Sequence, residues 1–431
     1  MSHHDPFTAG FAGDPDHDFE IRTVLGHAYS GAADVGEVLA AVSGLRDDDH
    51  EAWFAAWDGL GDRVAALAEA ATGPGREASA ASAWLRASGY YGVAVDAVAA
   101  LDDDDRLLAT FRKHRAAWDR WVDTAAVDVE RVEIPYESTP LPGYLFRAPG
   151  SGADGRTDGD AGARPLLVAV NGSDGSLTSL WAAAVHGALA RGYHALVFDG
   201  PGQQSMLFER GVPFRPDFEA VLTPVLDAAT AYPGVDADRV VVYGISQGGY
   251  WVTRALAFEH RPAAAVVDPG VVDVAASWTG RMPHSLLKHL DAGDDRRFDK
   301  EMALGMRLSP GTARTWRFRA RPYGTDGYAA TVRAVRQYDA RGVAGRITTP
   351  LLIADPEDEQ FWPGQPAELA RLTPGVSTLV RFTAAEGANH HCQPLARALT
   401  EQRMFDWLAG IDGLGQGAAT GAQAPAASRT A

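Results

Sequence analysis

A serine flanked by glycines is the first feature of this sequence that could do chemistry. Residues 244–249 read Gly-Ile-Ser-Gln-Gly-Gly and match the pattern G-x-S-x-G. The apolar segment 239–243 precedes this pattern, and an amphipathic segment running from Gly249 to about His260 follows it. A strand, a tight turn and a helix in that order lift a serine hydroxyl above the edge of a sheet. We therefore predict that Ser246 is a nucleophile and not part of an ordinary strand–helix turn.

A serine nucleophile needs a histidine base, and the base needs a carboxylate that orients it. In folds with such a turn, the acid and then the histidine follow the serine along the chain. The apolar strand predicted at 351–353 is followed by a loop that holds Asp355, Glu357, Asp358 and Glu359. Asp358 lies five residues beyond Ile353, which is the usual offset, so we favour it over Asp355 as the acid. We expect the other carboxylates of the loop to be solvated.

Two adjacent histidines follow the next predicted strand. Residues 388–393 read Ala-Asn-His-His-Cys-Gln, and the strand at 378–382 precedes them. One of these histidines, His390 or His391, is predicted to be the base. Cys392 is a rival nucleophile in principle, but no separate base is placed for it.

An acyl-transfer reaction also needs two N–H donors for the tetrahedral oxyanion. We predict the backbone amide of Gln247 as one donor and that of Ser173, in the loop after the apolar strand 165–170, as the other. Asp174 beside this loop is unexpected, because a carboxylate near an oxyanion is unfavourable unless it is protonated or turned away. Asp174 is either a loop-capping residue or an auxiliary acid.

These residues need a scaffold, and the pattern of the chain predicts one. Continuous apolar strands alternate with helices over 128–410, which is typical of a doubly wound, mostly parallel α/β sheet. The alternation lapses at about 271–346, where an Arg-rich helical cap is expected, and 149–164 is predicted to be a surface loop. Residues 19–127 form a helical N-terminal domain with tryptophans at helical spacing, whereas 1–18 and 411–431 are expected to be flexible.

Composition excludes several classes of protein. Lys and Arg number 39 against 56 Asp and Glu, which leaves a net charge of −17. A chain this acidic is a poor ligand for nucleic acid. One cysteine rules out an internal disulfide framework, and no metal or cofactor motif occurs. Because no long apolar run or leader pattern is present, we expect a cytoplasmic enzyme that has no cofactor, does not bind membranes and acts on a small molecule.

Taken together, these motifs resemble the α/β-hydrolase superfamily, and within it the branch with a helical N-terminal domain. That branch includes the dihydroxypseudooxynicotine C–C hydrolase and the fungal polyketide-shortening hydrolases of the melanin pathway. The resemblance covers about 76–410 and is carried by the segments 86–91, 199–203, 244–249, 355–361 and 386–393.

The resemblance also assigns residues. It implies His391, which precedes Cys392, as the base, whereas a count from Gly387 would choose His390. It also implies Asp358 as the acid and raises the case for Asp174 as an auxiliary acid. Gln204 departs from the glycine that is usual at its position.

The expected activity is hydrolysis of a carbonyl-activated bond. A C–C bond in a β-dicarbonyl or polyketide-like substrate fits the resemblance best. The alternatives are a carboxylesterase or lactonase with the same triad, a non-hydrolytic cyclase or acyltransferase, and a non-enzymatic interaction protein, against which an intact triad argues. The apolar helices of the N-terminal domain are expected to roof the pocket and to leave a surface for a homodimer.

Overall fold

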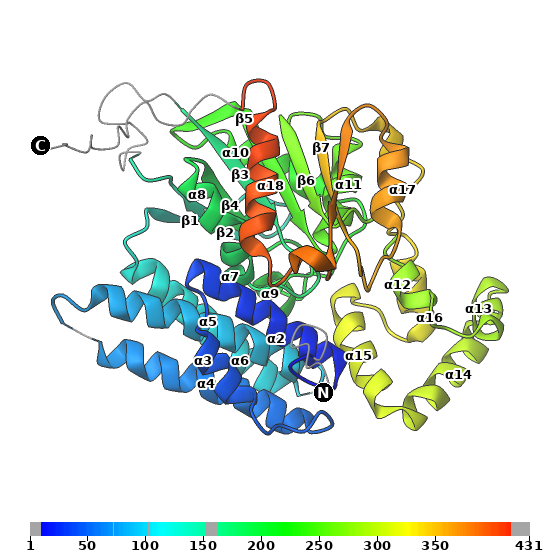
Figure 1. Cartoon of the computed structure of the whole chain (residues 1–431). Coiled ribbons are helices and arrows are strands. Elements are labelled where there is room, and N and C mark those ends of the chain that lie inside the picture. The colour runs from blue at the N-terminus through cyan, green and yellow to red at the C-terminus, as the bar shows by residue number, and fades with distance from the viewer. Residues whose placement is uncertain (1–9, 72, 102, 151–162, 415–431) are drawn as a thin grey trace, which may run out of the picture.

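The computed structural model describes residues 10–71, 73–101, 103–150 and 163–414. It has three parts: a central sheet with flanking helices, a group of helices formed by the N-terminal quarter of the chain, and a helical excursion between two strands of the sheet (Figure 1). The expected surface loop lies almost wholly outside the described residues, as does most of the expected C-terminal tail.

The sheet has eight strands in the order β1-β2-β4-β3-β5-β6-β7-β8. Strand β2 runs antiparallel to both of its neighbours, and the pairs from β4 to β8 are all parallel. This is the mostly parallel α/β sheet that the alternation of apolar strands and helices predicts. The strands are β1 (Val129–Ile134), β2 (Leu141–Phe146), β3 (Arg164–Val170), β4 (His194–Phe198), β5 (Val235–Ile245), β6 (Ala264–Asp268), β7 (Leu351–Pro356) and β8 (Ser377–Phe382).

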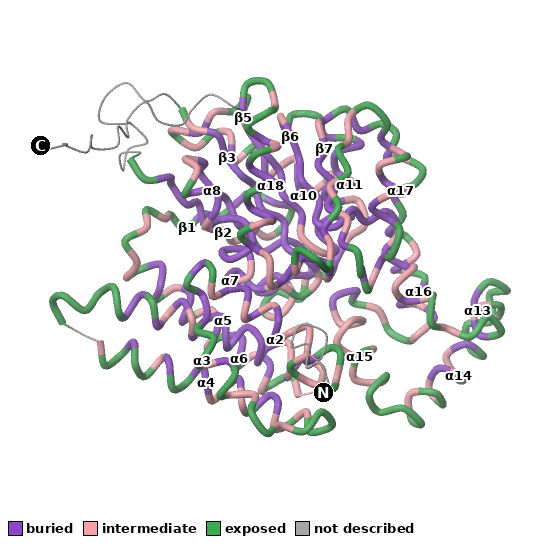
Figure 2. The backbone as a smooth tube through the Cα atoms, in the orientation of Figure 1, coloured by how far each residue is buried: buried purple, intermediate pink, exposed green. Residues whose placement is uncertain are grey.

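Helices cover both faces of the sheet, and the strands between them form the continuous buried centre of the molecule (Figure 2). The helix that follows β3 contains one π-helical turn, Trp181–Val185, between α7 and α8. The flanking helices are α7 (Leu177–Leu180), α8 (His186–Ala190), α9 (Gln204–Phe208), α10 (Glu219–Ala229), α11 (Gly248–Leu256), α17 (Gln365–Leu372) and α18 (Arg397–Ala409).

The N-terminal helices pack against the sheet domain through aromatic side chains. Trp121 of α6 lies 4.6 Å from the ring of Trp181 and 6.0 Å from that of Phe146. Burial of such large rings is a strong driving force for docking the two parts. The helices are α2 (Pro15–His27), α3 (Val35–Val42), α4 (His50–Ala70), α5 (Glu77–Ala99) and α6 (Asp104–Thr124).

The expectation of a flexible segment over 1–18 is wrong at its C-terminal end. Helix α2 begins at Pro15, and the side chain of Asp14 accepts hydrogen bonds from the backbone N–H groups of Asp16 and His17. An aspartate cap followed by proline is a standard start for a helix. Residues 1–9 lie outside the described part of the chain.

The cap region between β6 and β7 is helical, and its own small core is formed by α13, α14 and α16. Helix α15 lies nearest to the N-terminal helices (Figure 1), where Arg317 donates a hydrogen bond to the carbonyl oxygen of Ala100. The cap helices are α12 (Ala276–Thr279), α13 (His284–Asp291), α14 (Asp295–Leu308), α15 (Pro310–Ala320) and α16 (Tyr328–Val335).

Candidate active site

Ser246 lies in the sharp turn between β5 and α11. Its φ of 56° is in the left-handed region, which is strained for a non-glycine residue. The Ser246 N–H donates to the carbonyl oxygen of Asp268 at 2.7 Å, which fixes the turn against β6. A Cβ at Gly248 would lie 2.7 Å from the carbonyl oxygen of Val170, so the close approach of the backbones requires glycine there.

The structure brings His391 to Ser246. The Nε2 atom of His391 lies 2.9 Å from the Oγ atom of Ser246, within hydrogen-bonding distance. His391 is buried among three aromatic rings, those of Phe19, Phe361 and Trp362. His390 instead pairs through its backbone with Asp358 in an isolated β-bridge.

The carboxylate that contacts His391 is Glu359, and the prediction of Asp358 is wrong. The Nδ1 atom of His391 lies 2.8 Å from one carboxylate oxygen of Glu359 and 3.0 Å from the other. Asp358 is exposed, and it accepts a hydrogen bond from the Asn389 side chain at 2.5 Å. The alternative acid, Asp355, is paired with Arg381 across β7 and β8.

The error has a simple geometric cause. Strand β7 continues to Pro356, three residues beyond the predicted end of the strand, and the acid follows that end by three residues and not by five. In the loop that follows, the Asp358 N–H donates to the Asn389 carbonyl oxygen, and the Glu359 side chain turns into the protein. The loop contains both Asp and Glu residues, and nothing in the sequence indicates which of their side chains turns into the protein.

The surroundings of Glu359 favour its charged form. Burial raises the pKa of this carboxyl, but the charge and hydrogen bond of His391 and the backbone N–H groups of Phe361 and Trp362 outweigh burial and leave the pKa below its ordinary value. A carboxylate that stays ionised holds the imidazole in one tautomer and stabilises the imidazolium that forms when His391 takes a proton.

Cys392 does not have the environment of a nucleophile. Its Sγ atom donates to the carbonyl oxygen of Asp268 at 3.2 Å. Burial, followed by the charge of Asp268, raises the pKa of this thiol well above its ordinary value. The thiolate is therefore disfavoured at neutral pH.

The loop after β3 lies directly over Ser246. A Cβ at Gly172 would lie 2.9 Å from the Cβ of Ser246. The side-chain amide of Gln203 donates to the carbonyl oxygens of Asn171 and Gly172, both at 2.9 Å, and so holds the loop in place. Sequence reasoning noted the 199–203 motif but assigned it no role, whereas the structure shows that it braces this loop.

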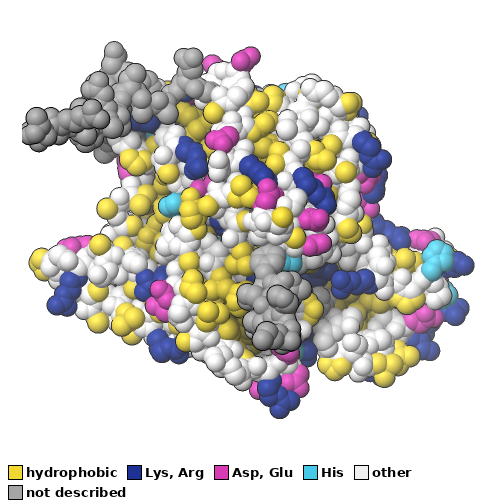
Figure 3. Space-filling model, in the orientation of Figure 1, with side chains coloured by type: hydrophobic (Ala, Val, Ile, Leu, Met, Phe, Trp, Pro, Cys, Tyr) yellow, Lys and Arg dark blue, Asp and Glu magenta, His cyan; other side chains and the backbone are white. Residues whose placement is uncertain are grey.

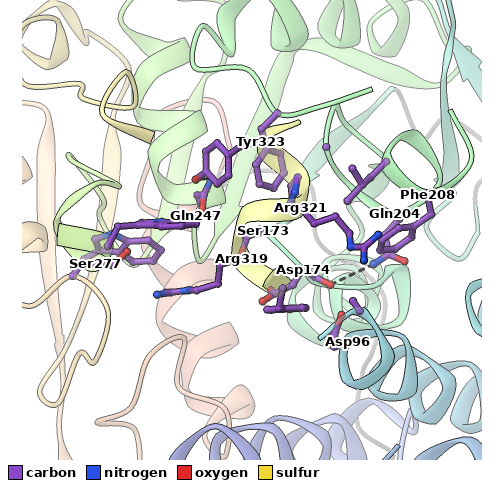
Figure 4. Close-up of a pocket in the computed structure, with 18 residues that line it drawn as sticks. Asp96, Ser173, Asp174, Gln204, Phe208, Gln247, Ser277, Arg319, Arg321 and Tyr323 are labelled. Carbon is purple, nitrogen blue, oxygen red and sulfur yellow. Dashed lines mark hydrogen bonds between the residues drawn. The ribbon is translucent and has the colours of Figure 1, made fainter. Parts of the chain in front are cut away.

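A pocket of about 620 Å³, including its mouth, opens beside this loop (Figure 4). Ser173 and Gln247, whose amides we predicted as oxyanion donors, both line it. The N-terminal helices and the cap also contribute to its wall, through Asp96 of α5 and Arg319 of α15. Aromatic rings form much of the remaining wall: Phe208, Phe214, Trp278, Phe318, Tyr323 and Trp362.

Two carboxyl groups, those of Asp96 and Asp174, line this pocket, and a third, that of Glu20, interacts with both. Asp174 lines the pocket and keeps an exposed surface there. The protein around it still removes part of the hydration of its carboxyl and raises the pKa, although Arg319 and then His391 oppose the shift. Burial, and then the charge of Asp174, also raise the pKa of Asp96 and bring that of Glu20 in α2 to about 7. Carboxyls that are close together cannot all ionise, so part of this group is held in the neutral form.

Gln204 is a further residue of the pocket that sequence reasoning did not explain. Its φ is 37°, and its side chain is buried. The side-chain nitrogen donates to the Asp174 carbonyl oxygen at 3.3 Å, and the side-chain oxygen has no hydrogen-bond partner among the described residues. Figure 4 shows the first of these contacts as a dashed line.

Within the described parts of the chain, no group of three or more His, Cys, Asp or Glu residues is arranged to hold a metal ion. Among the same residues, no helix has the length and apolar character needed to cross a bilayer.

Comparison with known proteins shows the family to which the chain belongs. Residues 167–402 match the profile of the alpha/beta hydrolase family. The hydrolase acrC of Aspergillus aculeatus is 33% identical over 422 residues, which cover 90% of this chain and 95% of that protein. The 20-hydroxy-prefusarin hydrolase FUS2 of Gibberella moniliformis is 30% identical over 412 residues, with the same coverage.

Among solved structures, the fold is similar to that of the 2,6-dihydroxy-pseudo-oxynicotine hydrolase. The TM-score is 0.70 at 20% sequence identity, and the match covers 91% of this chain and 97% of that one. This likeness extends over the helical N-terminal part as well as the sheet, and at this level of identity it shows the fold.

Proposed function

Because the chain belongs to the alpha/beta hydrolase family and is a hydrolase, we propose that it cleaves a carbonyl-activated C–C bond through a triad of Ser246, His391 and Glu359. The observation that carries this proposal is the continuous chain of contacts from the Ser246 hydroxyl through the His391 ring to the buried Glu359 carboxylate. This is the arrangement that activates a serine for attack on a carbonyl carbon.

In the proposed reaction, Oγ of Ser246 attacks the scissile carbonyl while Nε2 of His391 takes its proton. The backbone amides of Ser173 and Gln247 hold the oxyanion. When the C–C bond breaks, its electron pair leaves as an enolate, and His391 protonates the carbon to release a ketone. Water, activated by His391, then hydrolyses the acyl-serine to a carboxylic acid.

The pocket supports a polyketide-like or β-dicarbonyl substrate. Its wall is largely aromatic, and parts of the N-terminal helices and the cap close over it. Such enclosure lowers the local dielectric constant and strengthens the oxyanion donors. The relative FUS2, named as a 20-hydroxy-prefusarin hydrolase, supports a substrate of a similar kind. Asp174 is the proposed auxiliary acid, because the raised pKa of its carboxyl favours a protonated form that can donate a hydrogen bond.

A matched pair of substrates tests the choice between C–C and ester cleavage. Benzoylacetone and phenyl benzoate would deliver the same benzoyl group to Ser246 but release an enolate and a phenolate, respectively. We expect benzoic acid and acetone from the diketone. Cleavage of the ester alone would favour a carboxylesterase or lactonase. Transfer of the benzoyl group to an added alcohol without hydrolysis would favour an acyltransferase.

We propose that the enzyme works in the cytoplasm as a homodimer. The N-terminal helices carry exposed apolar side chains, among them Leu39 and Leu67. In Figure 3 the visible face mixes hydrophobic side chains with charged side chains of both signs. Light scattering coupled to size-exclusion chromatography tests this proposal, because a mass near 45.8 kDa would mean a monomer.

A further inference from the structure

The guanidinium of Arg319 is a cation in the pocket that no acid neutralises directly. Arg319 lies near the end of α15 and lines the pocket, and among the described residues it has no ion pair or hydrogen bond. It contacts two aromatic faces instead, at 5.8 Å from the centre of the Trp278 ring and 5.6 Å from that of the Phe361 ring. By contrast, the neighbouring Arg321 forms an ion pair with Asp104 at 2.6 Å.

The charges around Arg319 come from several elements. Burial is the largest effect and leaves the pKa of Arg319 below its ordinary value; Asp174, the Tyr323 hydroxyl and Asp16 oppose this shift, and Arg281 adds to it. The carboxyl group with the largest effect on Arg319, that of Asp174, itself has a raised pKa. An arginine stays protonated even after such a shift. Arg319 therefore keeps its positive charge in the pocket, with N–H groups that have no acceptor among the described residues.

Arg319 also lies close to the proposed catalytic centre. The ring of Phe361 lies 4.7 Å from that of His391 and also contacts the Arg319 guanidinium, so one aromatic side chain separates the cation from the base. Ser173, Gln247 and Arg319 all line the same pocket. Figure 4 shows the Arg319 side chain extending away from Asp174, toward the Ser277 side of the pocket.

We infer that Arg319 binds the second carbonyl oxygen of a β-dicarbonyl substrate and stabilises the enolate that leaves when the C–C bond breaks. This inference rests on the proposed function. The electron pair of the broken bond delocalises from carbon onto that oxygen, and the Arg319 N–H groups donate to the oxygen as its charge grows. His391 then supplies the proton to the carbon. An ester has no second carbonyl in this position, so Arg319 selects for the diketone.

The first test compares the two substrates in Arg319→Met, Arg319→Lys and a control, Arg297→Met, at an exposed arginine of α14. We expect Arg319→Met to lower the ratio of kcat/KM for benzoylacetone over phenyl benzoate by about 100-fold, similar to the loss of one oxyanion donor. Lysine should restore part of the ratio, and the control should leave it unchanged. An equal loss on both substrates would mean that Arg319 only supports the fold of the pocket, and the inference would fail.

The second test needs no turnover and separates this inference from the proposed function. In the Ser246→Ala variant, benzoylacetone should bind as its enolate. The absorbance band of the enolate should then be visible at a pH below the pKa of the free diketone. The double variant Ser246→Ala/Arg319→Met should lack this band. Arg319-dependent enolate binding by an enzyme that never cleaves the diketone would overturn C–C hydrolysis and the leaving-enolate role with it, and would keep only Arg319 as the site that binds the second carbonyl oxygen. Absence of the band in Ser246→Ala, or its persistence in the double variant, would overturn the inference.

Discussion

Gly26 of α2 packs directly against the carbonyl oxygen of Pro394, three residues after His391. A Cβ at Gly26 would overlap that oxygen. Helix α2 also places Phe19 beside the His391 ring, at 6.0 Å between centroids. The N-terminal helices therefore contact the loop that carries the proposed base, in addition to lining the pocket.

This contact predicts the effect of Gly26→Ala. The added methyl group must push α2 away from the His391 loop, so we expect a loss of about 1–3 kcal/mol in the free energy of unfolding together with a lower kcat. The matched control is Gly59→Ala in α4, where a Cβ would meet only the far end of Arg63. Denaturant unfolding and steady-state kinetics on both variants check this, and equal behaviour of the two would contradict it.

Ser246→Ala should keep the fold and lower turnover by at least about three orders of magnitude, as the loss of a triad serine does. His391→Ala should cost about as much, because its Nε2 contacts the serine, whereas His390→Ala should be milder. Circular dichroism confirms folding, and product formation under saturating substrate gives kcat. A dead His390→Ala variant beside an active His391→Ala variant would assign the base to the other histidine.

Glu359→Gln and Asp358→Asn form a pair of isosteric changes at neighbouring positions. Glu359→Gln removes the charge that orients His391, so kcat should fall by up to about 10⁴-fold. Asp358→Asn should have a much smaller effect on kcat, because the Asp358 carboxylate contacts the Asn389 side chain and not the His391 ring. Reversed effects would restore Asp358 as the acid.

Glu20 predicts how stability depends on pH. Its pKa is raised in the folded protein to about 7, so the protonated carboxyl is favoured by folding. This contribution to stability is present below the ordinary pKa of a glutamate and is lost as pH rises through about 7. The free energy of unfolding should therefore fall between pH 5 and pH 8, and less steeply in Glu20→Gln.

The control for this measurement is Glu69→Gln, at an exposed position of α4, which should leave the slope unchanged. Asp16, Asp96 and Asp174, the carboxyls that interact with Glu20, remain in both variants. Parallel curves for the wild type and Glu20→Gln would show that Glu20 titrates normally.

Gln204→Gly should relieve backbone strain and enlarge the pocket. Glycine adopts a φ of 37° at little cost, and the change removes a buried side-chain oxygen that has no partner among the described residues. We expect an equal or higher Tm and a shift of kcat/KM toward bulkier acyl groups. Gln204→Ala should enlarge the pocket almost as much but keep the strain. A lower Tm for glycine than for alanine would argue against strain at this position.

The sequence by itself determined the features that depend on local pattern. Alternating apolar strands and helices predicted the sheet, which the structure and the family comparison confirm. The glycines around Ser246 predicted a strand–turn–helix, since a tight turn excludes side chains whatever the rest of the fold does. From the residues alone, the position of the base could be narrowed to one of the two adjacent histidines after β8.

Tertiary structure alone decided which side chains meet. Glu359 rather than Asp358 reaches His391, because β7 continues to Pro356 and Asn389 holds the Asp358 side chain on the surface. The interacting carboxyls of Glu20, Asp96 and Asp174 come from α2, α5 and the loop after β3, which are segments with no sequence pattern in common. Burial and mutual repulsion set the protonation of these carboxyls, and both depend on distances that exist only once the helices have packed on the sheet.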